Sequence, residues 1–270
     1  YLNTGKAPFN QLAVRQAISS AIDRQKLYQV AESGYAPVAH PTSLVLPANQ
    51  SNLDPAFANV AFSLNTSRST QLLTSVGFTR GSDGIFVDKN GKKLSFNINV
   101  VTGWTDWVTQ AQIIASNLKA VGIEATANPI SFNSYFSALQ MGTFDMAISW
   151  TNPGPTPFYL YNSLLNSVDS APIGQQASSN FERWMDSTTD KLLAQYATTT
   201  DSSLQQQALN GLQQIMVEQL PSIPLVFGPT WNEYSTRNFT GWPSANNAYA
   251  SPGPFDFPDA EVVVLNLKPA

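Results

Sequence analysis

The stretch TDWVTQAQIIASNLKAVGIEATANPISFNSYFSALQMGTFDMAISW, residues 105–150, decides the fold class of this 270-residue chain. Apolar residues recur at helical spacing as far as Gly122, and an apolar strand over residues 123–127 follows at once. Ser131 is the expected N-cap of a second helix that ends at Gly142. Residues 144–150 then alternate as in a strand. Helix–strand–helix–strand order with glycine stops predicts an α/β sandwich.

The sequence before this stretch predicts a short strand over residues 1–4 and two helices. Asn10 and Ser67 are their expected N-caps. The dipeptide Asn90-Gly91 separates two apolar runs, residues 85–87 and 94–101. Asn-Gly between such runs predicts a β-hairpin.

The sequence after residue 150 predicts more helices and a less regular tail. Ser187 and Asp190 fit a capping box, and Asp201 is expected to begin a further helix. Residues 223–227 predict a buried strand. From residue 241 the tail is rich in proline and glycine, and it is expected to end in a strand over residues 261–267.

Composition excludes several functional classes. The net charge is −4, with 14 Lys+Arg against 18 Asp+Glu, and no basic run is available to bind nucleic acid. There are no cysteines, which excludes disulfides, thiolate metal sites and cysteine nucleophiles. No apolar run approaches the roughly 20 residues that span a bilayer. Charged residues make up only 12% of the chain, and this low share is typical of exported proteins.

Catalytic and metal-binding constellations are also missing. His40 is the only histidine, so a catalytic triad or a typical zinc site is not expected. The acidic residues are scattered, and the close pair Asp186 and Asp190 lies at a predicted helix start, where carboxylates cap. We therefore expect no catalytic residue, no metal and no cofactor.

Six segments, in order, resemble the family-5 bacterial solute-binding proteins of peptide, nickel and oligosaccharide importers. The likeness covers nearly the whole chain, and these are the segments that carry it: NQLAVRQAISSAIDR (10–24), GFTRGSDGIFVDKNGKKLSFNINV (77–100), AQIIASNLKAVGIEA (111–125), FDMAISW (144–150), NFERWMDSTTDKLLAQYATTTD (180–201) and EQLPSIPLVFGP (218–229). The later segment TWNEYSTRNFTGWPSANNAYASPGP (230–254) is similar to the branch that binds cello-oligosaccharides.

The resemblance implies a periplasmic-binding-protein-like α/β fold, with a mixed sheet and flanking helices. Residues 1–228 would form lobe II of a two-lobed protein, with residues 1–4 and 226–231 as crossing segments. Residues 229–270 would return to lobe I, which the chain lacks, so we expect a fragment or a processed chain. The implied partners are a small ligand, an ABC permease and the missing lobe. The implied location is extracytoplasmic, in the periplasm or as a cell-surface lipoprotein.

Tryptophans are the candidate ligand contacts. Trp150 ends a predicted strand, and open α/β sheets bind ligands at the carboxyl ends of strands. Trp104 and Trp231 are further candidates, and the neutral groups of Thr151 and Asn152 suit hydroxyls.

The absence of an acidic residue shortly after residue 150 indicates the class of ligand. Peptide-binding members of the family carry an aspartate shortly after the strand that resembles residues 144–150, whereas no acid follows here before Asp169. A buried ammonium group without a counter-charge is costly. We therefore expect a neutral oligosaccharide, with an oligopeptide as the alternative ligand. A carbohydrate-active enzyme and a sensor that uses the same fold remain as alternatives of other classes.

Overall fold

The structure is a computed structural model that describes residues 1–151, 154–228, 232–244, 246–251, 253 and 258–270. The chain divides into two units, Tyr1–Phe227 and Gly228–Ala270. Among the described residues, no helix combines the length and the apolar character needed to cross a bilayer.

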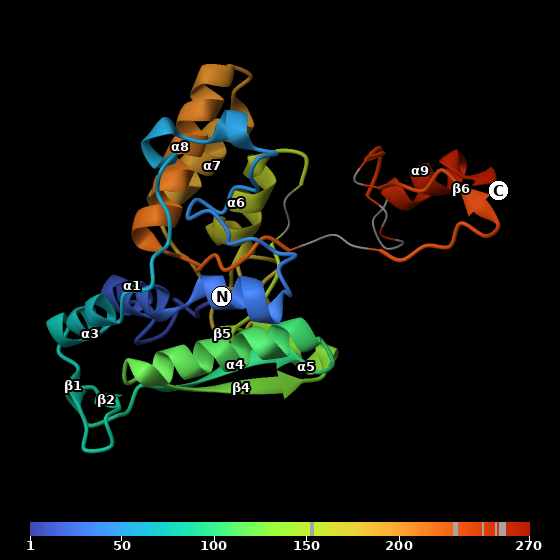
Figure 1. Cartoon of the computed structure of the whole chain (residues 1–270). Helices are drawn as coiled ribbons and strands as arrows, with labels where there is room; N and C mark the ends of the chain where they lie inside the picture. Colours follow the sequence, from blue (N-terminus) through green and yellow to red (C-terminus); the bar gives the residue numbers. More distant parts are fainter. Residues whose placement is uncertain (152–153, 229–231, 245, 252, 254–257) are drawn as a thin grey trace. The chain divides into compact units, whose positions relative to one another are not determined.

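A sheet with the strand order β4–β3–β5 organises the first unit (Figure 1). Strand β3 (Ser95–Val101) runs parallel to β4 (Glu124–Ile130) over its whole length and parallel to β5 (Met146–Ala147). Leu2 adds an isolated antiparallel bridge to Met146. The predicted α/β class with a mixed sheet is therefore confirmed.

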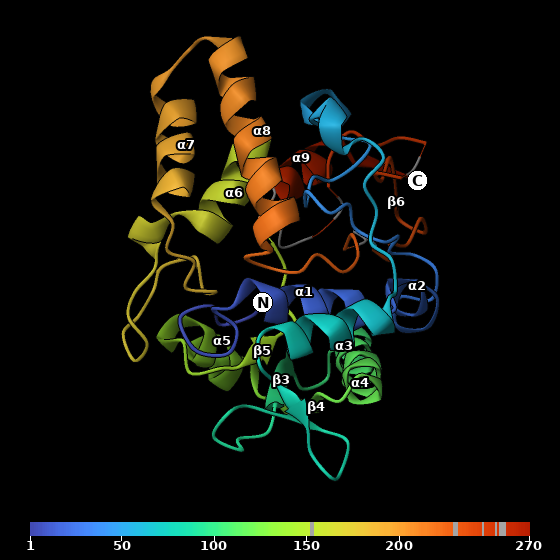
Figure 2. The same ribbon diagram turned by 90° about the vertical axis from the view of Figure 1, so that its left-hand side faces the viewer.

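Helices cover both faces of this sheet. On one face, α1 (Leu12–Ala21) and α4 (Thr105–Ala120) bury Ile98 and Val100 in the largest apolar cluster. On the other face, α5 (Phe132–Met141) packs on Val101 and Ala147. Helix α3 (Thr66–Ser75) lies beside α1 (Figure 2). Because helices cover both faces, β3 is buried continuously from Ile98 to Val101. Asn99 is the polar residue in this stretch, and its side-chain oxygen accepts a hydrogen bond from Asn128 at 2.9 Å.

A second core lies among α6 (Pro157–Leu165), α7 (Ser187–Thr198) and α8 (Ser202–Gln219). Figure 1 shows these helices grouped on the side of α1 away from the sheet. Their facing leucines, such as Leu164, Leu193 and Leu212, are almost fully buried. The remaining short elements of this unit are α2 (Arg24–Lys26), a π turn (Leu27–Ala31), 3-10 turns (Gln50–Asn52, Pro55–Phe57, Ser167–Asp169) and the antiparallel pair β1 (Thr79–Arg80) and β2 (Phe86–Val87).

Two buried arginines, Arg15 of α1 and Arg24 of α2, bind the end of α8 and the segment that follows it. Arg15 donates to the carbonyls of Gln219 and Leu220, and Arg24 donates to that of Pro224 at 2.8 Å. Burial lowers the pKa of Arg15 to about 10 and that of Arg24 to about 9. These cations are held by backbone carbonyls, which satisfy buried donors without a second charge.

Helix ends agree with the sequence only in part. Ser131 and Asp201 cap α5 and α8 as predicted. The predictions for the other three starts are wrong: Gln11 precedes α1 without a side-chain bond, Asn65 caps α3, and Asp186 caps α7. Several capping residues lie within two positions of the starts of α3 and α7, so residue type alone does not select the cap, and α1 begins one residue later than Asn10 would cap it.

The strand predictions are less accurate. The Asn90-Gly91 turn forms, but its hairpin has a single bridge, Val87 to Lys93, because β3 pairs within the parallel sheet. The strand predicted over residues 144–150 is regular only in β5. Residues 223–227 contribute just a bridge between Val226 and Val38, since Pro221 and Pro224 limit regular pairing.

The second unit contains a helix where a strand was predicted. Residues 261–267 lie mostly in α9 (Asp259–Asn266), whose first turn holds two acids that suit a helix N-terminus. A short run of β-branched residues does not distinguish strand from helix, which explains the error. The antiparallel pair β6 (Phe239–Thr240) and β7 (Lys268–Pro269) completes the described part of this unit.

Candidate functional site

Three indole rings meet at the carboxyl ends of β3 and β5. Trp104 and Trp107 contact edge-to-face at 4.8 Å between centroids, and Trp150 lies 5.9 Å from Trp104 and 5.7 Å from Trp107. We call Trp104, Trp107 and Trp150 the indole platform. Its two outer rings are partly open to solvent, since Trp104 is 36% and Trp150 is 45% exposed.

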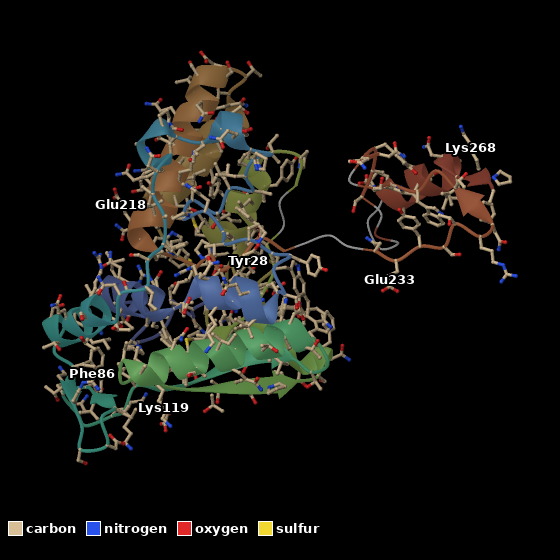
Figure 3. The ribbon with its side chains drawn as sticks, viewed as in Figure 1. Tyr28, Phe86, Lys119, Glu218, Glu233 and Lys268 are labelled. Carbon is tan, nitrogen blue, oxygen red and sulfur yellow. The ribbon has the colours of Figure 1, made fainter. Side chains whose placement is uncertain are left out.

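The strand order explains why residues 46 positions apart meet. Because β3 and β5 are parallel neighbours, their carboxyl ends lie at one edge of the sheet. Trp104 follows β3 through a turn at Gly103, whose φ of +89° suits glycine, and then precedes α4. Trp150 follows β5 directly. Lys119, labelled in Figure 3, lies in the last turn of α4, at the opposite end of the helix from Trp104.

The predicted ligand contacts lie in different parts of the structure. Trp104 and Trp150 are in contact, and Thr151 is exposed next to Trp150; that they contact a ligand stays a prediction. Asn152 and Trp231 lie outside the described residues. Trp107 is partly buried: it packs against the largest apolar cluster and also joins the platform.

Phe132, the first residue of α5, extends the aromatic surface. It is 46% exposed, lies 6.0 Å from Trp104 and stacks on Phe136. Phe132 comes two residues after the end of β4. This position in the sequence could have indicated that its ring lies near the strand ends.

Neutral groups fix the main chain beneath the platform. The hydroxyl of Tyr135 donates to the carbonyl of Ile148 at 2.5 Å, and that of Tyr1 donates to the carbonyl of Trp150 at 2.7 Å. Burial raises the pKa of both phenols well above the ordinary value, so both act as neutral donors.

Two acidic groups lie near the platform in different environments. Asp106 is exposed in the first turn of α4, between the two platform residues of that segment. Glu32 is buried and accepts a hydrogen bond from Gln110 at 2.5 Å. Burial and the charge of Asp106 raise the pKa of Glu32, while the bond from Gln110 opposes this. Of these two acids, Asp106 is the one open to solvent.

Catalytic and metal chemistry find little support in the described part of the chain. No group of three or more His, Cys, Asp and Glu side chains there is placed to hold a metal ion. His40 Nδ1 lies 2.8 Å from the Thr42 hydroxyl in a loop, as a packing histidine would. Asp186 and Asp190 act locally: Asp186 caps α7, and Asp190 accepts from Ser167.

Two cavities lie elsewhere in the first unit. One of about 380 Å³ is lined by the hairpin lysines together with Phe78 and Phe96, and one of about 360 Å³ is lined by His40, Phe62 and Phe227. No platform residue lines either of these two cavities.

Comparison with known proteins shows the family. The sequence profile of bacterial extracellular solute-binding proteins, family 5 (middle region), matches residues 1–171. The chain belongs to this family. Among curated relatives, this family-5 chain is 24% identical over 226 residues to a di/tripeptide-binding protein of Pseudomonas aeruginosa, covering 83% of the chain and 38% of the relative. It is also 24% identical to a nickel-binding periplasmic protein of Escherichia coli, covering 78% of this chain and 39% of that protein.

Solved family-5 structures share the fold. A mannohexaose-bound periplasmic oligopeptide-binding protein of Thermotoga maritima superposes with a TM-score of 0.91 at 24% identity, over 100% of this chain and 51% of the other. AppA of Bacillus subtilis, bound to a nonapeptide, superposes with a TM-score of 0.78 at 19% identity, over 100% of this chain and 49% of AppA. The chain thus spans about half the length of these proteins or less. The named relatives are binding proteins of transport systems and not enzymes.

Proposed function

We propose that this chain forms one wall of the ligand site of an extracytoplasmic solute-binding protein, which delivers a neutral oligosaccharide to an ABC permease. The observation that carries the proposal is the indole platform, with two rings partly open at the carboxyl edge of a parallel sheet. Exposed indoles in contact with one another offer flat apolar faces at the place where open α/β sheets bind ligands.

The surroundings of Trp150 favour a neutral ligand. Thr151 and Asn152 provide uncharged donors and acceptors, and no acid follows them before Asp169. Hydroxyls both donate and accept hydrogen bonds, so a sugar pairs with such groups without a buried charge. The Thermotoga maritima protein that this chain resembles in fold binds mannohexaose, which supports an oligosaccharide.

An oligopeptide is the second candidate, and Asp106 favours it. This exposed carboxylate lies between Trp104 and Trp107 in sequence, where it would meet the ammonium group of a peptide. The relatives named for di/tripeptides and for a nonapeptide support this alternative as well.

The rest of the binding site would come from another part of the intact protein. The division of the chain after Phe227 supports the proposal that residues 1–228 form lobe II, that residues 1–4 and 226–231 cross between lobes, and that residues 229–270 return to lobe I. Closure of two lobes about such crossings is a common mode of ligand capture. A periplasmic or lipid-anchored location is part of the proposal.

Titration calorimetry on the intact protein decides between the ligands. We expect cello- or manno-oligosaccharides to bind, tripeptides not to bind, and Asp106→Asn to leave sugar affinity within about twofold. Peptide binding that Asp106→Asn abolishes, without sugar binding, would replace the oligosaccharide by the peptide.

A further inference from the structure

Trp150 is held by a segment that no regular strand supports. Strand β5 ends at Ala147, and the last ladder-like bond is donated by the Ile148 amide to the Asn99 carbonyl at 3.1 Å. The backbone from Ile148 to Trp150 therefore depends on other groups for its position, because its carbonyls still need donors.

Two phenol side chains supply those donors. Tyr135, on α5, is fully buried, and its hydroxyl reaches the Ile148 carbonyl at 2.5 Å. Tyr1 reaches the Trp150 carbonyl at 2.7 Å. The Tyr135 ring also contacts Trp107, with 6.3 Å between centroids. Tyr135 thus contacts the Trp107 ring directly and binds the main chain that leads to Trp150.

We propose that Tyr135 is a positioning residue for ligand binding: its hydroxyl fixes the main chain of residues 148–150 so that the Trp150 indole stays beside Trp104. The inference rests on the proposed function of the platform, and it adds a residue that contacts no ligand. Without the hydroxyl, the Ile148 carbonyl loses its buried donor and the segment relaxes toward another one.

The chain offers a matched control in Tyr161. This tyrosine is also fully buried, on α6, and its hydroxyl donates to the Thr42 carbonyl at 2.8 Å. It belongs to the second core, among α6, α7 and α8. Tyr135→Phe and Tyr161→Phe therefore remove the same kind of bond, and only the first touches the platform.

The experiment compares both variants in the intact protein by calorimetry with the oligosaccharide and peptide panel. We expect similar drops in unfolding temperature, with ligand affinity about fivefold lower in Tyr135→Phe and unchanged in Tyr161→Phe. Equal ligand affinity in the two variants overturns the proposal.

A second readout separates this proposal from the proposed function. The indole N–H resonance of Trp150, assigned with Trp150→Phe, should shift in Tyr135→Phe and stay in place in Tyr161→Phe. If the wild type binds nothing in the panel, the proposed function fails, and this resonance alone decides: a shift supports the positioning role, and an unmoved resonance overturns it.

Discussion

Trp150 is partly exposed although it contacts two other indoles. An aromatic ring that loses its remaining exposure to a ligand contributes strongly to binding, so Trp150→Ala should lower ligand affinity at least about tenfold. Stability should change by about 1 kcal/mol or less, because the site is on the surface. Calorimetry and thermal unfolding of the intact protein measure both quantities. Tyr35→Ala, at a ring that is 78% exposed, is the control that should leave affinity unchanged.

Glu182 presents a different residue-scale effect, on stability. It is 1% exposed, and neither carboxylate oxygen has a hydrogen-bond partner among the described residues. Burial raises its pKa from 4.5 to about 8, against the opposing charge of Arg183. A folded-state pKa above the unfolded one gives stability that is complete below pH 4.5 and is lost as the pH rises through 8.

Glu182→Gln removes this pH dependence because an amide does not ionise. We expect the free energy of unfolding of the variant, relative to that of the wild type, to be up to a few kcal/mol higher at pH 9 than at pH 5. Thermal or urea unfolding of this chain at both pH values measures the gain. Glu124→Gln, at an exposed glutamate of β4, serves as the control. A difference between Glu182→Gln and wild type that is the same at pH 5 and pH 9 contradicts the assignment.

The sequence predicted that Trp150 follows a strand, but not that Trp104 and Trp150 meet. Trp104 and Trp150 follow apolar strands, and the parallel pairing of β3 with β5 then brings them together. The support by Tyr135 was not predictable, because it joins α5 to a carbonyl that only tertiary packing brings near. The same holds for the partial exposure of Phe132.

At the scale of elements, the end of α5 depends on Gly142. Its φ is +64°, and a Cβ there would lie 2.9 Å from the Arg183 guanidinium, which donates to the Gln140 carbonyl at the end of the helix. Gly142→Ala should therefore cost about 2–4 kcal/mol of stability, through backbone strain and displacement of Arg183. Gly77→Ala is the matched control, since φ there is +90° and no atom lies within 4 Å. It should cost only the strain of about 1 kcal/mol. Equal losses in urea unfolding would show that Arg183 is not displaced.

Elements with strong local signals were predicted well, and those that depend on partners were not. Helices α4 and α5 end at Gly122 and Gly142 as their sequences indicate. Strand β5 is short because its neighbours, and not its alternation, decide where pairing stops. In the second unit, the run Val262 to Leu265 has strand composition but forms part of α9.

At the scale of the whole molecule, the platform is a partly exposed surface on a chain about half as long as its solved relatives. Ligand sites bury most of the ligand surface, and a single wall cannot do so. We expect this chain alone to bind its ligand at least about a hundredfold more weakly than the intact protein. Parallel titrations of both measure the ratio. Similar affinities would mean that the chain holds a complete site.

The most direct test is a crystal structure of the intact protein with a bound cello- or manno-oligosaccharide. The account predicts a sugar ring stacked on the exposed face of Trp150 or Trp104, enclosed from the opposite side by the rest of the protein. A ligand bound away from both indoles would contradict it.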